Sequence, residues 1–114
     1  MRLKHATKMQ NLSVKIIEIC DLLEGADNIK SLYLLFNLVE NILNYPYEDS
    51  YRILNLKSLK NKIFHLSLTK QLLDHLGFEY GFNIDFFVLP YDKDLLIIYE
   101  ARETLCNYLT GKLN

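Results

Sequence analysis

The sequence predicts an α+β domain in which helices pack on a small three-stranded antiparallel sheet. Apolar residues recur at helical spacing in the first half of the chain and again near its end, and two short β-rich runs flank a glycine-containing loop. Half of the 114 residues are hydrophobic, while only 4 are Gly and 2 are Pro. A chain of this length and composition can bury a single core without help from a metal or a disulfide.

The first half of the chain predicts two antiparallel helices. The first spans about residues 12–24 and ends at Gly25. Its apolar face consists of Leu12, Ile16, Ile19, Cys20 and Leu23. Asp27 or Asn28 caps the second helix, which ends near Asn44, before a Tyr-Pro pair. Its apolar face consists of Leu32, Leu35, Phe36, Val39 and Leu43.

The middle of the chain is less regular. Residues 47–50 predict a turn or one short helical turn. Residues 51–56 alternate loosely and carry β-compatible side chains, which favours a short strand. Residues 59–64 fit either a helix or a loop.

A short helix over residues 70–76 follows. Ser67 or Thr69 provides its N-cap, and Gly77 occupies the position where a left-handed residue often ends a helix.

The last third of the chain predicts a β-hairpin and a helix. Residues 78–80 and 84–89 are rich in β-forming side chains, and a Gly-Phe-Asn loop joins them. Asp92 caps a final helix over about residues 93–109, and Gly111 closes it. Its inner face consists of Leu95, Ile98, Tyr99, Arg102, Cys106 and Leu109.

The ends of the chain and its cysteines indicate how it is organised and where it resides. The basic start predicts a flexible N-terminal arm over residues 1–10, ahead of a domain over residues 11–111. Apolar runs of about five residues are far short of the roughly 20 that span a bilayer, so we expect no membrane segment and a location in the cytoplasm or the nucleus. Cys20 and Cys106 both fall in helical apolar patterns, which predicts two core residues in a reducing compartment.

The sequence contains no recognisable catalytic or metal-binding motif. It has no Gly-rich phosphate loop, no Gly-x-Ser-x-Gly elbow and no His-Glu-x-x-His helix. His5, His65 and His75 do not fall at the spacing of metal ligands. We therefore expect a protein that is not an enzyme and that needs no metal or cofactor.

Charge is distributed unevenly along a nearly neutral chain. The net charge is −1, which disfavours a general nucleic-acid binder. Residues 51–73, however, contain no acidic residue and five basic ones, namely Arg52, Lys57, Lys60, Lys62 and Lys70. This segment is either a binding patch for an acidic ligand or a solvated lysine-rich loop, and the charge pattern alone favours the second interpretation.

A set of ordered motifs gives the chain a resemblance to a known family. The motifs are Asn41-Ile42-Leu43-x-x-Pro46, then Tyr51-Arg52-x-Leu54-x-Leu56, then Leu72-Leu73-x-x-Leu76-Gly77-Phe78, and finally Leu89-Pro90 before the last helix. In this order and at these distances the chain resembles the PUB domain (also called PUG), known from peptide:N-glycanase and from UBA- or UBX-containing proteins. The resemblance covers about residues 30–109.

The resemblance implies a peptide-binding adaptor in ubiquitin-linked protein degradation. PUB domains bind the short, acidic, tyrosine-containing C-terminal tail of the hexameric AAA ATPase called valosin-containing protein, or similar motifs. Asn41 matches a family asparagine that hydrogen-bonds the peptide, and Tyr51 matches a tyrosine that lines the pocket. Gly77 and Phe78 match a pair that borders the groove. We expect the module to act as a monomer.

Two positions depart from the family pattern. Asn55 stands where peptide:N-glycanase has an arginine, and Ser58 stands where it has an asparagine. Loss of the guanidinium removes a strong partner for carboxylates, and Lys57 and Lys60 lie close enough in sequence to compensate.

Two alternative functions stay open at this stage. One is a nucleic-acid-binding domain that uses the basic segment 52–70, although only Phe64 provides an aromatic ring between Arg52 and Lys70. The other is a purely structural helical domain. Each candidate residue also has an ordinary structural interpretation, because Tyr51 and Phe78 suit a core and Gly77 suits a helix cap.

Overall fold

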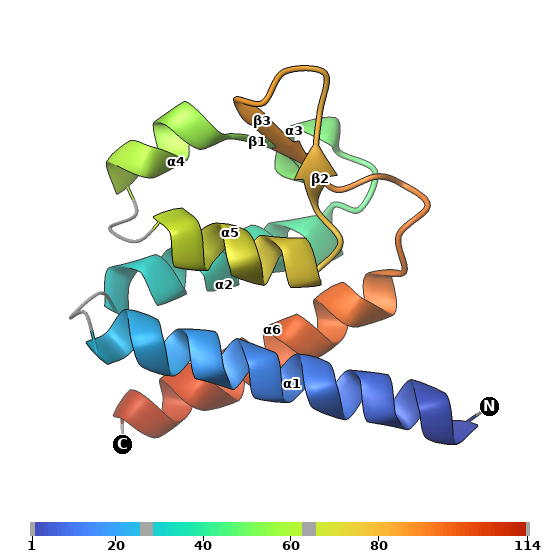
Figure 1. Ribbon diagram of the computed structural model, residues 1–114, viewed down its shortest axis with the longest axis vertical. Helices are drawn as coiled ribbons and strands as arrows, with labels where there is room; N and C mark the ends of the chain where they lie inside the picture. Colours follow the sequence, from blue (N-terminus) through green and yellow to red (C-terminus); the bar gives the residue numbers. More distant parts are fainter. Residues whose placement is uncertain (1, 26–28, 63–65, 114) are drawn as a thin grey trace.

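The structure is a computed structural model that describes residues 2–25, 29–62 and 66–113. The helices are α1 (Arg2–Gly25), α2 (Ile29–Asn44), α3 (Asp49–Arg52), α4 (Leu56–Lys62), α5 (Leu66–His75) and α6 (Leu95–Leu113). The strands are β1 (Ile53–Asn55), β2 (Glu79–Tyr80) and β3 (Phe86–Val88). Figure 1 shows the sheet at one end of the molecule, α1 and α6 at the other, and α2 and α5 between them.

The three strands form one antiparallel sheet in the order β1-β3-β2. Leu54 pairs with Phe87, and Phe87 pairs with Tyr80, so these three side chains share one face of the sheet. The rings of Phe87 and Phe78 lie 6.0 Å apart, which anchors this face to the core. The predicted α+β class with a small three-stranded antiparallel sheet is therefore confirmed.

Packing of α1, α2 and α6 forms the centre of the core. Each contributes side chains that are fully buried, among them Ile16, Leu35 and Ile98. Cys20 on α1 is also buried, as predicted, whereas Cys106 on α6 is partly exposed. The second helix ends at Asn44, where the sequence places its end. Its expected N-cap, Asp27 or Asn28, lies outside the described residues.

The N-terminal helix is longer than predicted. α1 begins at Arg2, so the predicted start of the first helix near residue 12 is wrong. This segment contains no Gly or Pro, and Ala, Leu, Met, Gln, Lys and Arg are all good helix formers. Because the segment shows no clear apolar period, only its propensity signals the helix.

The middle segment forms more helix than predicted. Tyr51 and Arg52 belong to α3, and the strand is limited to Ile53–Asn55 because the side chain of Asn55 caps α4. The ambiguous segment is helical up to Lys62. Residues 63–65 lie outside the described part of the chain. α5 begins at Leu66, so neither Ser67 nor Thr69 is its N-cap.

The boundaries of β3 and α6 also differ from the prediction. The strand begins at Phe86 because the carbonyl of Asn83 accepts from the Phe86 amide at 3.0 Å and its side chain accepts from the Asp85 amide at 2.9 Å, which closes a turn there. α6 is capped by Asp94, whose carboxylate accepts from the Leu96 amide at 2.9 Å, and not by Asp92. The helix continues through Gly111 to Leu113, so Gly111 does not close it.

The cap predicted at Gly77 is confirmed. Gly77 has a φ of +105°, in the region that favours glycine. The Gly77 amide donates to the carbonyl of Asp74 at 3.0 Å, and the Phe78 amide donates to the carbonyl of Leu73 at 3.0 Å. This pair of bonds is a Schellman motif, and it turns the chain from α5 into β2.

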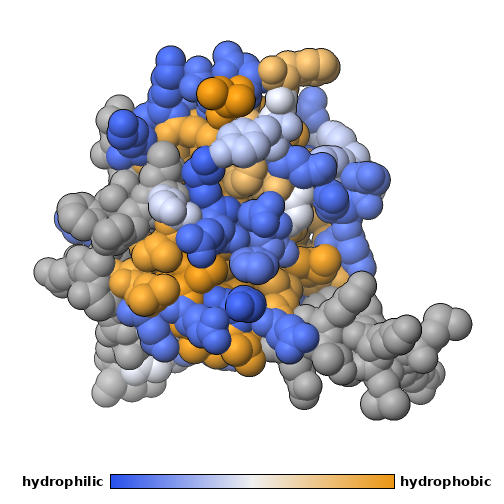
Figure 2. Space-filling model, in the orientation of Figure 1, coloured by the Kyte–Doolittle hydropathy of each residue, from blue (hydrophilic) through white to orange (hydrophobic). Residues whose placement is uncertain are grey.

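Apolar side chains are exposed around the sheet, where they include Ile53, Phe82 and Ile84, and also along α1. Figure 2 shows apolar side chains on the lower half of this face, and α1 exposes Val14, Ile17 and Leu22. Within the described ranges, no helix is long and apolar enough to cross a membrane.

Candidate functional site

A groove between α2 and the free side of β1 gathers four of the predicted site residues. Its walls come from four elements, and its volume is about 250 Å³. The lining residues are Leu34, Asn37, Leu38 and Asn41 from α2, Ser50 and Tyr51 from α3, Ile53, Leu54 and Asn55 from β1, and Ser58 and Leu59 from α4. This volume is below the usual range of small-molecule pockets and suits one large side chain of a longer ligand.

The groove combines an apolar floor with uncharged polar groups. Leucines on α2, β1 and α4 supply the apolar surface. Asn37 and Asn41 lie one turn apart on α2, so their amides share one face of the helix. An amide side chain both donates and accepts hydrogen bonds, as does a peptide backbone. The lining contains no charged residue, so the groove presents amide and hydroxyl groups beside an apolar surface.

Tyr51 is held in place by α3 and by a neighbouring ring. The rings of Tyr51 and Tyr45 lie 5.6 Å apart at an angle of 35°. Tyr45 supports the Tyr51 ring from outside the groove lining, and truncation of Tyr51 would leave the Tyr45 ring without this contact.

Asn55 has a structural role that the sequence comparison does not predict. Its side-chain oxygen accepts hydrogen bonds from the backbone amides of Lys57 at 3.0 Å and Ser58 at 3.3 Å. These are the bonds of an N-cap, so Asn55 orients α4 as well as lining the groove. An arginine at this position could not make them.

The two candidate lysines flank the groove without lining it. Both belong to α4, the helix that provides Ser58 and Leu59. The ammonium group of Lys57 lies 3.4 Å from the carboxylate of Asp85, and its side chain is 77% exposed. Lys60 is exposed. The positive charge near the groove is thus solvated, and part of it is already paired.

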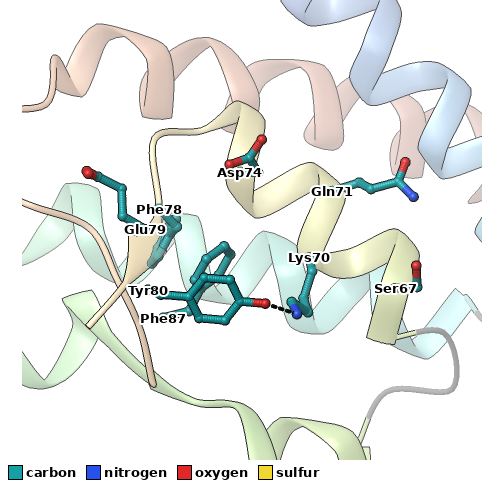
Figure 3. A pocket seen from close by; sticks show the side chains of 8 residues that line it. All are labelled: Ser67, Lys70, Gln71, Asp74, Phe78, Glu79, Tyr80 and Phe87. Carbon is teal, nitrogen blue, oxygen red and sulfur yellow. Dashed lines mark hydrogen bonds between the residues drawn. The ribbon is translucent and has the colours of Figure 1, made fainter. Parts of the chain in front are cut away.

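Gly77 and Phe78 lie apart from this groove. Gly77 forms the cap of α5, and Phe78 is only 1% exposed. Phe78 lines a separate hollow of about 700 Å³ between α5 and β2, which Figure 3 shows. There the amine of Lys70 points toward the hydroxyl of Tyr80 and is hydrogen-bonded to it. The ring centres of Tyr80 and Phe87 lie 5.1 Å apart. The predicted pair therefore does not join Asn41 and Tyr51 around one site.

Arg52 connects the two loops that frame the sheet. Its guanidinium donates to the carbonyl oxygens of Pro46 at 2.8 Å, Leu89 at 3.3 Å and Pro90 at 3.2 Å. It also lies 4.1 Å from the ring centre of Tyr91. With 3% exposure, Arg52 is a structural residue that fixes α3 and the start of β1, and hence one wall of the groove.

The Tyr91 ring that covers Arg52 is itself anchored to α3. Its hydroxyl donates a hydrogen bond to the carboxylate of Asp49 and lies 3.2 Å from the carbonyl oxygen of Tyr47. The bond to Asp49 raises the pKa of Tyr91 above the ordinary value of 10.0, because the neutral phenol is the form that donates it.

The basic residues of segment 52–70 lie in different surroundings. Arg52 is buried, Lys57 faces Asp85, and Lys70 is bonded to Tyr80 at the other hollow. The side chain of Lys62 lies outside the described part of the chain. Lys57 and Lys60 are both exposed on α4, so the exposed positive charge of this segment lies on that helix.

Several residues of the groove escaped the sequence analysis. Asn37 precedes Asn41 by one helical turn, so a search for repeated amides on one helix face would have found it. Ser50 and Ile53 gave no such signal, because only the folding of α3 and β1 against α2 brings them to the groove. Among the described residues, no group of three or more His, Cys, Asp or Glu side chains could hold a metal ion.

No family model and none of the curated proteins matches this chain. The case for a function therefore rests on the motifs and on the geometry of the groove.

Proposed function

We propose that this chain is a PUB-like peptide-binding module whose ligand docks in the groove between α2 and β1. The ligand would be the acidic, tyrosine-containing C-terminal tail of a valosin-containing-protein-type AAA ATPase, or a similar motif. In this role the chain is an adaptor in ubiquitin-linked degradation and has no catalytic activity of its own.

One observation carries this proposal. Asn41 and Tyr51, which match the family motifs, line the same groove as Asn55 and Ser58, the two positions that depart from the peptide:N-glycanase pattern. Tyr51, Asn55 and Ser58 lie on consecutive elements, whereas Asn41 comes from α2, so the fold brings Asn41 to the other three. The shape also suits a short peptide, because the hollow has room for one large side chain beside polar groups that can hold a backbone.

The charges around the groove support a modest preference for acidic ligands. Lys57 and Lys60 on α4 can attract carboxylates, but Asp85 already faces Lys57 at 3.4 Å. The groove lining is uncharged, so most of the affinity should come from ring burial and backbone hydrogen bonds. We expect a dissociation constant on the order of 1–100 μM, because the contact area is small.

The first test is a calorimetric titration with a synthetic acidic peptide that carries a tyrosine next to its C-terminus. A parallel titration with an oligonucleotide of the same net charge serves as control. Saturable binding of the peptide alone is the expected result. Absence of heat and of NMR shifts at millimolar peptide would refute the proposal, and tighter binding of the oligonucleotide would favour the nucleic-acid alternative.

Substitutions at Tyr51 and Asn41 locate the binding site. Tyr51→Ala should weaken peptide binding by about 1–3 kcal/mol, because a contacting ring is lost, and Asn41→Ala should weaken it by about 1 kcal/mol. Tyr99→Ala and Asn107→Ala on α6 are matched controls, since both residues are exposed and lie outside the groove. Full affinity in either groove variant, with an unchanged circular dichroism spectrum, would show that its assignment is wrong.

A further inference from the structure

The edge of β1 that faces the groove determines how a peptide can lie there. β1 pairs with β3 on one side and, among the strands that the structure describes, has no neighbour on the other. The groove is lined by all three residues of β1 and by no residue of β2 or β3. It therefore lies along the unpaired edge, which is the kind of edge to which an extended peptide can add.

The pairing register identifies which backbone groups reach this edge. The Leu56 amide donates to Asp85 at 2.7 Å, and the Leu89 amide donates to Arg52 at 2.9 Å. In an antiparallel ladder, alternate residues point their backbone groups to the same neighbour, so the amide and carbonyl of Leu54 also face β3. The backbone groups of Ile53 and Asn55 therefore point the other way, toward the groove.

We expect the flanking helices to take two of these four groups. Ile53 is the C-cap of α3, so its amide is the donor that the helical pattern directs to the carbonyl of Asp49. Asn55 is the N-cap of α4, and the helical pattern directs the Leu59 amide to its carbonyl. The groups left for a ligand are the carbonyl of Ile53 and the amide of Asn55.

This remaining pair has the pattern of a parallel strand. In parallel pairing, one residue donates its amide to the residue before its opposite number and accepts with its carbonyl from the residue after it. Antiparallel addition would instead need both groups of Ile53 or both groups of Asn55. The geometry points to a ligand that adds to β1 as a parallel strand, with one residue held opposite Leu54 by two backbone hydrogen bonds.

Parallel addition also determines where the side chain of the held ligand residue points and which groups on α2 face the ligand. The held residue points its side chain to the same face as Leu54, where the leucines of the groove supply apolar surface. The backbone groups of its neighbours point away from β1, toward α2, where Asn37 and Asn41 can pair with them. The ligand would therefore be an extended segment with one large apolar or aromatic residue, held from both sides.

The chain direction follows from the same pairing. β1 runs directly into α4, so a parallel ligand runs from α3 toward α4. The end of an acidic tail would then approach the helix that carries Lys57 and Lys60. This inference rests on the proposed function, because it requires that a peptide occupies the groove.

Amide hydrogen exchange with the peptide described above tests the inference on the full chain. At saturation, exchange at the Asn55 amide should slow by about tenfold or more, since it gains a hydrogen bond, whereas the Leu54 amide, already paired with β3, should change little. Spin labels at either end of the peptide test direction: a C-terminal label should broaden the Lys57 and Ser58 signals, and an N-terminal label those of Ser50 and Tyr51.

The outcomes separate the two proposals. If the peptide binds and Tyr51→Ala weakens it, but Asn55 exchange is unchanged or the labels give the reverse pattern, parallel strand addition is wrong and the peptide-binding function stands. If no peptide binds at any concentration, the proposed function fails, and this inference fails with it.

Discussion

Asn55 serves both the helix that follows it and the groove beside it. Its side chain caps α4, and its backbone amide lies at the free edge of β1. The arginine that peptide:N-glycanase has at the matching position can hold a carboxylate but cannot cap a helix. The chain therefore has a well-defined α4 in place of a charge at the groove.

Two substitutions at Asn55 separate the effect of helix capping from the effect of a charge placed at this position. Asn55→Asp keeps the cap, so stability should stay within about 0.5 kcal/mol, while affinity for an acidic peptide falls because a carboxylate now borders the groove. Asn55→Arg should cost about 1 kcal/mol of stability, yet tighten binding by about 0.5–1.5 kcal/mol at low salt. Urea denaturation and calorimetry measure the two quantities. Equal losses of stability in both variants would contradict the capping role.

The pKa of Tyr91 gives a prediction about alkaline pH. Its pKa is raised mainly by the hydrogen bond to Asp49, so the folded state favours the neutral phenol. The stabilising contribution of this bond is complete below pH 10 and is lost as the pH rises through the folded-state pKa. A spectrophotometric titration of the 8 tyrosines should show a phenol that ionises at a higher pH than the ordinary value of 10.0. Tyr91→Phe should remove this ionisation, and Tyr99→Phe should leave it in place. An ionisation at this higher pH that survives in Tyr91→Phe would refute the assignment.

At the scale of elements, the cap between α5 and β2 depends on glycine. Gly77 has a φ of +105°, and an added Cβ would meet the Lys93 side chain at 3.3 Å. Gly77→Ala should therefore destabilise the fold by about 1–3 kcal/mol. Gly111→Ala is the matched control, because nothing lies within 4 Å of the place where its Cβ would be. Gly111 lies inside α6, so alanine there should increase the stability of the fold by about 0.5–1 kcal/mol. Thermal unfolding measures the change in stability of both variants. Equal changes would contradict the special requirement for glycine at position 77.

Elements with strong local signals could be predicted from the sequence, and their boundaries often could not. The Tyr-Pro pair after α2 correctly predicts the end of this helix at Asn44, and Gly77 correctly predicts the cap after α5. Asp92 and Asp94 are both plausible caps for α6, and only the folded chain shows that Asp94 makes the bond. Gly111 is accommodated within α6 because helix propensity is a weak signal that context can override.

The groove was predictable only in part, for a similar reason. Polar residues of the family motifs, such as Asn41 and Tyr51, can be located in a sequence. The free edge of β1 cannot, because it depends on the order β1-β3-β2, which arises from contacts between distant segments. The position of Phe78 in a second hollow likewise follows from the turn at Gly77, and the sequence spacing does not reveal it.

At the scale of the whole molecule, Arg52 joins segments that are far apart in the sequence. Arg52→Met should destabilise the fold by about 2–4 kcal/mol, because hydrogen bonds from a charged donor to Pro46, Leu89 and Pro90 are lost from a buried position. Lys60→Met on exposed α4 is the control and should change stability by less than about 0.5 kcal/mol. Urea denaturation measures both variants. A similar midpoint for Arg52→Met and the native chain would show that the loops hold together without it.

The placement of the groove also couples recognition to folding. One wall belongs to α2, in the helical core, and the other belongs to α3, β1 and α4, at the sheet end of the molecule. A bound peptide would bridge these two parts and so act as a reversible cross-link that only the folded chain can accept. At a free peptide concentration of about 100 times the dissociation constant, this linkage stabilises the fold by about 2.7 kcal/mol. The same thermodynamic cycle means that any change that loosens the sheet end from α2 also weakens the peptide complex, even where it touches no ligand atom.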